Sequence, residues 1–348
     1  AMSNELLTLK NLKQYFPVGK DRFVRAVDGV DLTINHGDVM GLVGESGSGK
    51  STIAYTVMGM YGMTGGEIDF EGEVFTKETK RKRSMKFRRE AQIVFQDPGS
   101  SLNPYQDVRS ILSLPLKVHK VVPKNEIDDK ILEILEMVEL PADFMYKSPN
   151  SIGGGEKQLV SIARALCCNP KFIILDEPTA ALTRNESEKL YTLVDKLKEN
   201  GVSIIFISHR FEDMYRLASR VTVFRDSKYI GTYDVDGITN ADLIKAMVGR
   251  EINDLFPKPE VELGDEMLRI EHLSRTGFFK DVSFNVRAGE IVGLTGLVGA
   301  GRTEVVEAVC GITRPDEGKV FLEGKEVYIK TPSEAMEKGV ILLPEDRQ

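Results

Sequence analysis

The stretch "VMGLVGESGSGKST", residues 39–52, joins an apolar run to a glycine-rich turn and then to the start of a helical stretch. Residues 44–51 fit the pattern G-x-x-x-x-G-K-[ST], in which glycine backbones and a helix N-terminus surround phosphate groups. Lys50 is expected to reach the β- and γ-phosphates, and the Ser51 hydroxyl to bind Mg²⁺. The stretch therefore predicts a P-loop domain of the α/β class. The loop residues expected to contact the bound phosphates and metal are Gly44, Ser46, Gly47, Ser48, Gly49, Lys50, Ser51 and Thr52.

A second apolar strand, "KFIILDEP" at residues 171–178, ends in two adjacent carboxylates. Asp176 suits a metal ion, directly or through water, and Glu177 suits the base that activates an attacking water. The alternative is a strand that ends in a solvated acidic turn, which would be the better interpretation if the chain had no P-loop. With the P-loop present, the two motifs together predict nucleotide hydrolysis.

Length and composition are those of a soluble chain with room for two domains. The 348 residues are 41% apolar, and no apolar run approaches the ~18 residues that a membrane helix needs. The N-terminus lacks a secretion-signal pattern, so we expect a cytoplasmic chain. A net charge of −7 argues against nucleic acid as the main partner. Cys167, Cys168 and Cys310 lack metal-ligand spacing and are expected to be buried or half-buried.

The sequence repeats itself at a shift of 252 residues, which places Val30 on Val282. "VDLTINHGDVMGLVGESGSGKST" then falls on "VSFNVRAGEIVGLTGLVGAGRTE", and "TGGEIDFEG" falls on "DEGKVFLEG". These coincidences indicate a duplication. Both copies are expected to begin with alternating apolar positions, followed by a buried strand ("VMGLVG" and "IVGLTG"), a glycine-rich loop and a helix.

The repeat sets the expected domain boundaries. We expect a complete first domain at residues 1–249, a linker at 250–266 and a partial second domain at 267–348. The segment "GREINDLFPKPEVELGDEM" carries two prolines and mixed charge without sustained periodicity, which is typical of a linker.

Three weaker features accompany the two motifs of the first copy. Gln96 follows an apolar strand, "SIGGGEKQLVSIARAL" places a glycine-rich turn before an amphipathic helix, and His209 ends the strand "VSIIFISH". A glutamine or histidine at a strand end is more often a polar cap than a ligand contact, so each feature alone indicates little. Their order and spacing carry the information.

The order P-loop, glutamine, glycine-rich turn, "ILDEP" and histidine resembles the ATP-binding cassette (ABC) ATPases over the whole first copy. The resemblance implies a RecA-like P-loop core with an antiparallel β subdomain and a helical subdomain at about residues 97–160. It also implies a head-to-tail dimer, in which ATP lies between the P-loop of one cassette and the signature turn of the other. ATP and Mg²⁺ are the implied ligands, and transmembrane permease subunits and a second cassette are the implied partners.

The resemblance also assigns roles to single residues. Gln96 would contact Mg²⁺ and water, and His209 the γ-phosphate. Phe16, or Tyr15 beside it, would stack on adenine, although core packing is the alternative for both rings. The signature turn would consist of Ile152, Gly153, Gly154, Gly155 and Glu156.

The signature turn departs from the family pattern, which usually reads Leu-Ser-Gly-Gly-Gln. Gly153 stands at the serine position, and Ser151 lies one residue too early. A hydrogen bond to a charged group is worth about 1.5–3 kcal/mol. We therefore expect a weaker closed dimer and slow ATP hydrolysis.

Different segments of the chain resemble two different branches of the family. "GLVGESGSGKST" and "QIVFQDPGSSLNP" resemble dipeptide and oligopeptide importers, whereas "AALTRNE" with Thr183, "ISHRFEDMYRLASRVTVFRDSKYIGT" and the second copy resemble sugar importers, which are often two cassettes in one chain. A recombined or engineered chimera joined near "ILDEPTAALT" is one explanation, and a natural branch with mixed traits is the other. Permease choice is expected to follow the peptide-like half, because the helical subdomain normally contacts the permease.

The run "KETKRKRSMKFRR", residues 77–89, has eight Lys or Arg in thirteen positions. We expect a solvated helix that leads into the strand before Gln96, because Phe87 is the only aromatic within the run. Nucleic acid or anionic lipid is the alternative partner for this run.

The second glycine-rich loop, "LTGLVGAGRTE" at residues 294–304, carries Arg302 where a P-loop has lysine. Gly296, Gly299 and Gly301 keep the glycine pattern and Thr303 keeps a hydroxyl, but a planar guanidinium does not replace a compact ammonium. We expect this loop to hold a phosphate weakly at best.

The end of the chain falls at the position that Gln96 has in the first copy. "VILLPEDRQ" aligned on the strand "QIVF" puts Glu345 there, and the constant shift puts Gln348 there. The signature turn, the "LDE" strand and the histidine then have no second copy. We expect one competent nucleotide site per chain, completed by the signature turn of another chain's first cassette.

The leading hypothesis is the ATP-hydrolysing subunit of a peptide or sugar importer, peripheral at the inner face of the cell membrane. One alternative is a chimeric or truncated chain that binds ATP but hydrolyses it weakly. Another is a soluble tandem-cassette protein that acts on ribosomes or nucleic acid, for which a long charged connector would be expected.

Overall fold

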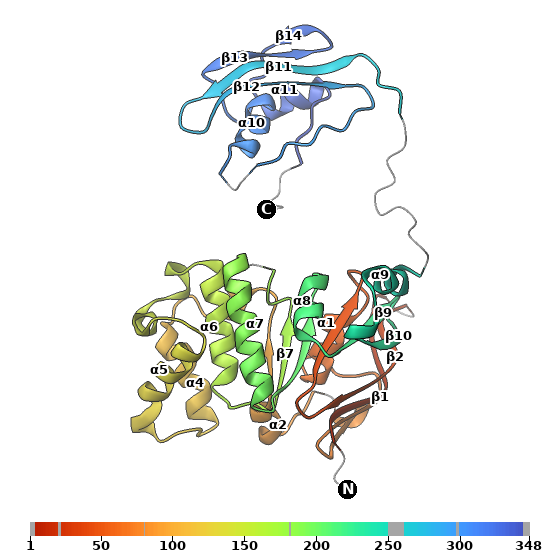
Figure 1. Ribbon diagram of the computed structural model, residues 1–348, viewed down its shortest axis with the longest axis vertical. Coiled ribbons are helices and arrows are strands. Elements are labelled where there is room, and N and C mark those ends of the chain that lie inside the picture. The colour runs from red at the N-terminus through yellow and green to blue at the C-terminus, as the bar shows by residue number, and fades with distance from the viewer. Residues whose placement is uncertain are drawn as a thin grey trace. The chain divides into compact units, whose positions relative to one another are not determined.

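The computed structural model describes residues 4–19, 22–79, 81–180, 182–249, 261–296 and 299–343. The chain divides into two units, Ala1–Asn253 and Asp254–Gln348 (Figure 1). No helix of the described residues is both long and apolar enough to cross a membrane.

A six-stranded sheet forms the centre of the first unit, in the order β10-β9-β3-β8-β7-β6. Pairing is parallel from β6 to β9, and β10 joins β9 antiparallel. The continuous apolar strands β3, β7 and β8 are buried along their whole length, as expected for inner strands of a parallel sheet. The strands are β3 (Val39–Gly44), β6 (Ala91–Val94), β7 (Phe172–Asp176), β8 (Ser203–Ile207), β9 (Arg220–Arg225) and β10 (Lys228–Asp234).

A second, antiparallel sheet packs against this core in the order β2-β1-β4-β5. One apolar cluster joins this sheet to the P-loop helix and the core sheet, through side chains such as Leu9, Val57 and Ile174. The elements are β1 (Glu5–Pro17), β2 (Phe23–Asn35), β4 (Gly65–Phe70), β5 (Glu73–Thr76) and the P-loop helix α1 (Lys50–Val57).

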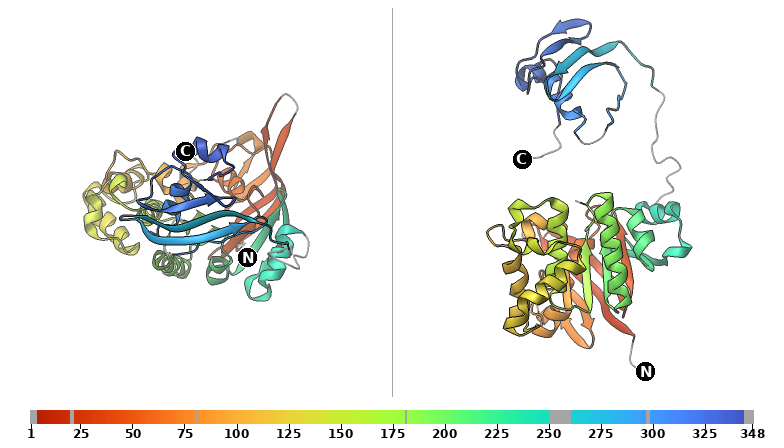
Figure 2. Two further views of the ribbon diagram at one scale, coloured as in Figure 1. Left: turned by 90° about the horizontal axis from the view of Figure 1, so that it is seen from above. Right: turned by 60° about the vertical axis from the view of Figure 1, so that its left-hand side comes forward.

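Helices form the opposite end of the unit. Figures 1 and 2 show α4, α5 and α6 gathered away from the antiparallel strands β1 and β2. The helices of the unit beyond α1 are α2 (Met85–Glu90), α3 (Pro98–Ser101), α4 (Val108–Val118), α5 (Ile127–Met137), α6 (Gly154–Leu166), α7 (Arg184–Glu199), α8 (Phe211–Leu217) and α9 (Asn240–Val248). The α/β P-loop fold with an antiparallel sheet and a helical part, predicted from the sequence, is confirmed.

The second unit repeats the antiparallel sheet, because its strand order β12-β11-β13-β14 matches β2-β1-β4-β5. The glycine-rich loop repeats too, with φ of 82° at Gly299 against 80° at Gly47. The sequence repeat therefore corresponds to a structural repeat. The elements are β11 (Glu266–Arg275), β12 (Phe279–Arg287), α10 (Arg302–Val309), β13 (Glu317–Leu322), β14 (Lys325–Val327) and α11 (Pro332–Glu337).

The prediction of a buried strand at "IVGLTG" is wrong. Residues 291–296 form no strand, and Ile291 is 98% exposed. In the first unit β8 and β9 flank the equivalent strand β3, whereas no strand among the described residues of the second unit pairs with 291–296. The predicted strand in "VILLPEDRQ" is likewise absent from 340–343, where Leu343 is 92% exposed. The predicted positions Glu345 and Gln348, with 250–260 of the predicted linker, lie outside the described residues.

The basic run at 77–89 is not one solvated helix. Its 3₁₀ turn and the short helix α2 flank Arg83, which is buried. The Arg83 guanidinium donates hydrogen bonds to the carbonyl oxygens of Thr56 (2.7 Å) and Val57 (2.9 Å) and lies 4.3 Å above the Phe75 ring. Burial lowers the pKa of Arg83 to about 10, so it stays charged at neutral pH. The side chain therefore ties the last turn of α1 to the antiparallel sheet.

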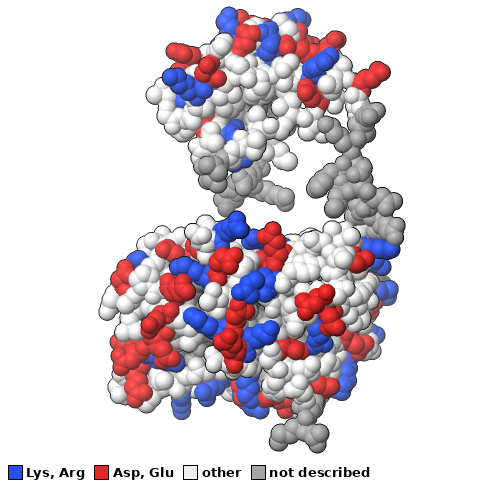
Figure 3. Space-filling model, viewed as in Figure 1, with Lys and Arg blue, Asp and Glu red and all other residues white. Residues whose placement is uncertain are grey.

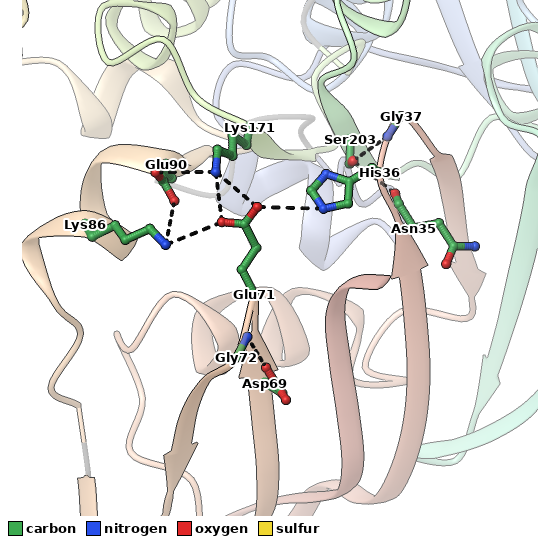
Figure 4. Close-up of polar contacts among 10 residues, drawn as sticks. All are labelled: Asn35, His36, Gly37, Asp69, Glu71, Gly72, Lys86, Glu90, Lys171 and Ser203. Atoms are coloured by element: carbon green, nitrogen blue, oxygen red, sulfur yellow. Dashed lines mark hydrogen bonds and ion pairs between the residues drawn. The ribbon is translucent and has the colours of Figure 1, made fainter. Parts of the chain in front are cut away.

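A charged network joins the antiparallel sheet to the start of β7 (Figure 4). Glu71, in the turn between β4 and β5, accepts a hydrogen bond from Lys171 at 2.8 Å and lies 3.5 Å from Lys86 and 3.7 Å from His36. Glu90 lies 3.6 Å from Lys171. Burial raises the pKa of Glu71, but the hydrogen bond and charge of Lys171 outweigh it and hold the pKa below its usual value.

The surface charge of the first unit is unevenly spread. Figure 3 shows acidic side chains gathered over α5, at the helical end of the unit. The exposed carboxylates of this helix are Asp128, Asp129, Glu133 and Glu136. The three cysteines are free and buried, as predicted.

We predict that Arg83→Met lowers the free energy of unfolding by about 1–3 kcal/mol, because two buried carbonyl oxygens lose their charged donor. Urea denaturation measures the change. Arg81→Met is the matched control, since Arg81 is exposed in the same run. Equal stability of the two variants would contradict the anchoring role.

Candidate functional site

At two positions, the loop between β3 and α1 lies so close to neighbouring backbone that only glycine fits. A Cβ at Gly44 would lie 2.2 Å from the Phe224 carbonyl oxygen, and one at Gly49 would lie 2.2 Å from that of Ala26. Gly49 also has a φ of 99°, which other residues rarely adopt. These glycines let the loop turn tightly between the sheet and the helix.

Lys50, the first residue of α1, folds back into this loop. Its ammonium donates hydrogen bonds to the carbonyl oxygens of Gly44 (2.8 Å) and Glu45 (2.9 Å) and lies 3.4 Å from the Ser48 hydroxyl. Only 5% of Lys50 is exposed. Burial lowers its pKa, while the charges of Glu177 and Asp176 oppose that shift.

Asp176, the last residue of β7, faces α1 across the sheet edge. Its Oδ1 accepts a hydrogen bond from the Ser51 hydroxyl at 3.0 Å. The residue is wholly buried, and burial raises the pKa of its carboxyl group. Its second oxygen, Oδ2, is buried with no hydrogen-bond partner among the described residues.

An unsatisfied carboxylate oxygen beside a serine hydroxyl fits a hard cation such as Mg²⁺. The described residues contain no group of three or more His, Cys, Asp or Glu side chains that could hold a metal. Mg²⁺ commonly binds through one or two protein oxygens together with substrate phosphates. Ser51 and Asp176 supply such a pair.

Glu177 follows in a strained backbone conformation and pairs with His209. Its φ is 48°, in the left-handed region, and its N–H donates to the Ile207 carbonyl oxygen at 2.9 Å. His209 Nε2 lies 2.5 Å from Glu177 Oε1, and Gln96 Nε2 lies 3.5 Å from Oε2. Burial raises the pKa of Glu177, and the charge of His209 opposes that shift.

The structure thus brings together side chains that follow four parallel strands. Lys50 and Ser51 follow β3, Gln96 follows β6, the Asp176–Glu177 pair ends β7, and His209 follows β8. Parallel strands carry their carboxyl ends to one sheet edge, which is where α/β proteins bind ligands.

The residues of the predicted signature turn lie apart from this group. Gly153 precedes α6, and its N–H donates to the Glu156 carboxylate at 2.8 Å. A Cβ at Gly155 would lie 2.1 Å from Glu186 of α7. Among the described residues, no hydrogen bond or ion pair joins this turn to Lys50 or Glu177.

The two candidate adenine-stacking rings differ in their partners. The Tyr15 hydroxyl donates to Asp28 at 2.5 Å. The Phe16 ring packs nearly perpendicular to the Tyr61 ring, with 5.1 Å between the ring centroids. Both rings border a cavity of about 760 Å³ that is also lined by Lys77. Stacking on adenine by either ring stays a prediction.

Tyr55 is a neighbour of the site that motif reasoning missed. It lies one helical turn after Ser51 on α1, so it shares the face that meets β7. Burial and the charge of Asp176 raise the pKa of Tyr55. The spacing of four residues from Ser51 was the available signal.

The sequence profile of the family described as "ABC transporter" matches residues 27–180 and 279–348. The chain belongs to the ABC transporter family. It is 35% identical over 329 residues to the ribose import ATP-binding protein RbsA of Geobacillus kaustophilus, covering 92% of this chain and 65% of that protein. It is 34% identical over 352 residues to the galactose/methyl galactoside import ATP-binding protein MglA 1 of Photobacterium profundum, covering 100% of this chain and 68% of that protein.

The chain spans about two thirds of the length of such relatives, 64% in the case of the RbsA protein of Rhodococcus jostii, which is 38% identical. Among solved structures, it resembles a dimeric bacterial ABC transporter cassette, with a TM-score of 0.61 and 30% identity over 67% of this chain and 100% of that chain. It also resembles a post-hydrolysis cassette dimer bound to ADP and Pi, with a TM-score of 0.60 and 28% identity. This match also covers 67% of this chain and 100% of that chain.

We predict that Asp176→Asn is more stable than the wild type at pH 7.5, by on the order of 1 kcal/mol, because it removes a buried charge. The folded pKa of Asp176 is raised, so ionisation destabilises the wild type as the pH rises through that pKa. The advantage of the variant should therefore shrink as the pH falls towards 4.

Urea denaturation between pH 4 and pH 8 measures this difference. Asp195→Asn is the control, because the Asp195 side chain is 41% exposed and pairs with Arg216. A stability gap that stays constant with pH would contradict the assignment of the cost to ionisation.

Proposed function

We propose that this chain is the ATP-binding and ATP-hydrolysing subunit of a sugar importer. The observation that carries the proposal is the convergence of Lys50, Ser51, Asp176, Glu177 and His209 at one edge of a parallel sheet. ABC transporter membership supports ATP as the substrate, and relatives named for ribose and galactose import support a sugar as the solute.

In this proposal the loop from Gly44 to Thr52 holds the phosphates, and Phe16 or Tyr15 holds the adenine. The Lys50 ammonium turns from the loop carbonyl oxygens towards the β- and γ-phosphates. Ser51, Asp176 and Gln96 would hold Mg²⁺, whose charge would stabilise the phosphate oxygens. Glu177 accepts the proton of the attacking water, and His209 contacts the γ-phosphate from the next strand.

A second cassette is the proposed partner for closure. Its signature turn, equivalent to Gly153 to Glu156 here, would cover the phosphates from the opposite side. The likeness to dimeric cassette structures supports this arrangement.

Membrane permease subunits are the further proposed partner, with the chain peripheral at the inner face of the membrane. Exposed aromatic side chains at the helical end of the unit support such a contact, since Tyr105 is 94% and Tyr146 is 75% exposed. Tyrosine side chains are enriched at protein–protein interfaces.

We propose a sugar as the solute even though one segment, "QIVFQDPGSSLNP", resembles peptide importers. Relatives named for sugar import align over 92% to 100% of the chain, which includes that segment. This continuity favours a natural branch with mixed traits over a chimera.

We predict that Glu177→Gln lowers ATP turnover by about 10²–10⁴-fold, because the water loses its base. ATP binding should remain, with one ATP per chain by calorimetric titration.

Lys50→Ala should abolish ATP binding, whereas Arg302→Ala should leave it unchanged. Wild-type turnover in the Glu177 variant, or a second ATP site of equal affinity, would refute this scheme.

We predict that Gly153→Ser strengthens ATP-driven dimerisation by about 10- to 100-fold and raises turnover, because it restores a hydroxyl bond worth about 1.5–3 kcal/mol. The position tolerates the change, since the one described residue within 4 Å of a Cβ there is Glu156, at 3.7 Å. Dimerisation is measured by sedimentation in the Glu177→Gln background, and turnover in the active protein.

Ser151→Ala is the matched control for this substitution. The Ser151 hydroxyl already donates to the Ser148 carbonyl oxygen at 2.8 Å, so its loss should leave dimerisation unchanged. If Gly153→Ser behaves like Ser151→Ala, the prediction that the altered turn weakens the closed dimer and slows hydrolysis is wrong.

A further inference from the structure

Asp213 is a buried carboxylate that lies outside all the motifs of the site. It belongs to α8, directly after the segment that carries His209, and has no exposed surface. A buried carboxylate is costly unless hydrogen bonds satisfy its oxygens. Here both oxygens accept hydrogen bonds.

Three hydroxyl groups donate to this carboxylate. Thr179 Oγ1 donates to Oδ2 at 2.6 Å, Ser208 Oγ donates to the same oxygen at 2.7 Å, and the Tyr191 hydroxyl donates to Oδ1. All three donors are themselves buried. The Arg210 guanidinium lies 3.9 Å from Oδ1 and forms an ion pair with it.

Two of these donors belong to the segments that carry the site. Thr179 lies two residues after Glu177 in the loop that follows β7, and Ser208 directly precedes His209 in the loop that follows β8. A single oxygen of Asp213 therefore joins the two loops. Tyr191 belongs to α7, and this helix contains no residue of the site.

The same two loops also meet at the site itself. The Glu177 N–H donates to Ile207, and the Glu177 carboxylate lies 2.5 Å from His209. The two loops are thus joined both by the direct contacts of Glu177 and by the shared oxygen of Asp213.

We propose that Asp213 is a positioning residue for ATP hydrolysis, which fixes the Glu177–His209 pair through the hydroxyls of Thr179 and Ser208. This inference rests on the proposed function, because it takes Glu177 and His209 as the catalytic pair. Without their common acceptor the two loops lose a shared anchor, and a displacement of about 1 Å in an active site can cost ~10²-fold in rate.

The first test is Asp213→Asn, which keeps the size of the side chain but leaves one acceptor oxygen and adds an N–H donor. We expect kcat to fall by about 10- to 100-fold. The KM for ATP should change by less than about twofold, because none of the P-loop contacts involves Asp213. Unfolding in urea, measured in parallel, corrects kcat for the folded fraction.

The matched comparison removes single hydroxyls from the same carboxylate. Ser208→Ala and Thr179→Val delete a donor on a site loop and should lower kcat by about 3- to 10-fold. Tyr191→Phe deletes a donor on α7 and should lower stability without changing kcat by more than about twofold. Equal losses of kcat in Ser208→Ala and Tyr191→Phe would show a general structural role and overturn the proposal. This comparison decides the question even if Asp213→Asn does not fold.

A double-mutant cycle with His209 completes the test. In the His209→Ala background, Asp213→Asn should lower kcat by less than about threefold further, because the geometry that it supports is already lost. Fully multiplicative losses would overturn the proposal. Failure of the proposed function itself is distinct, since Glu177→Gln would then hydrolyse ATP as fast as the wild type.

Discussion

The hydrogen bonds from the Lys50 ammonium to the carbonyl oxygens of Gly44 and Glu45 are the contacts on which the site depends. An ammonium with 5% exposure at the start of a helix is unfavourable unless oxygens surround it. The loop curves so that its carbonyl oxygens meet this charge, and Gly44 is also the last residue of β3. The same contact therefore fixes α1 relative to the sheet. His209 then follows the next strand, β8, and Asp176 and Glu177 end the strand after it, at intervals of about 4.8 Å per strand.

The site is locally unfavourable, and the rest of the unit has to hold it in place. Burial raises the pKa of Asp176 and of Glu177 and lowers that of Lys50, so each charged form is disfavoured where it lies. Glu177 also has a left-handed backbone. Such features persist where surrounding structure over-determines them. The buried strands β3, β7 and β8 provide that structure, and Asp213 adds a second link between the loops after β7 and β8.

Motifs with local causes could be predicted from the sequence, whereas contacts between distant segments could not. The P-loop follows from its glycines and Lys50, and the position of Asp176 follows from the end of an apolar strand. The sequence predicts a solvated helix around Arg83, because nothing in a run of basic residues marks the one whose guanidinium reaches Thr56 and Val57. Asp213 has no local motif either, since its donors lie up to 34 positions away along the chain.

The two copies separate what the local sequence determines from what the neighbouring strands determine. Gly299 and Gly301 have φ values of 82° and 83°, close to the 80° and 99° of Gly47 and Gly49, so the loop conformation follows from its own glycines. The apolar residues before the loop behave differently. Val39–Gly44 is a buried strand between β8 and β9, whereas 291–296 is exposed and pairs with no described strand. A strand exists only where partners accept its backbone hydrogen bonds. Loop geometry alone therefore does not assemble the candidate site. His209 comes near Lys50 through β8, which flanks β3, and Asp176 and Glu177 come near it through β7, which pairs with β8.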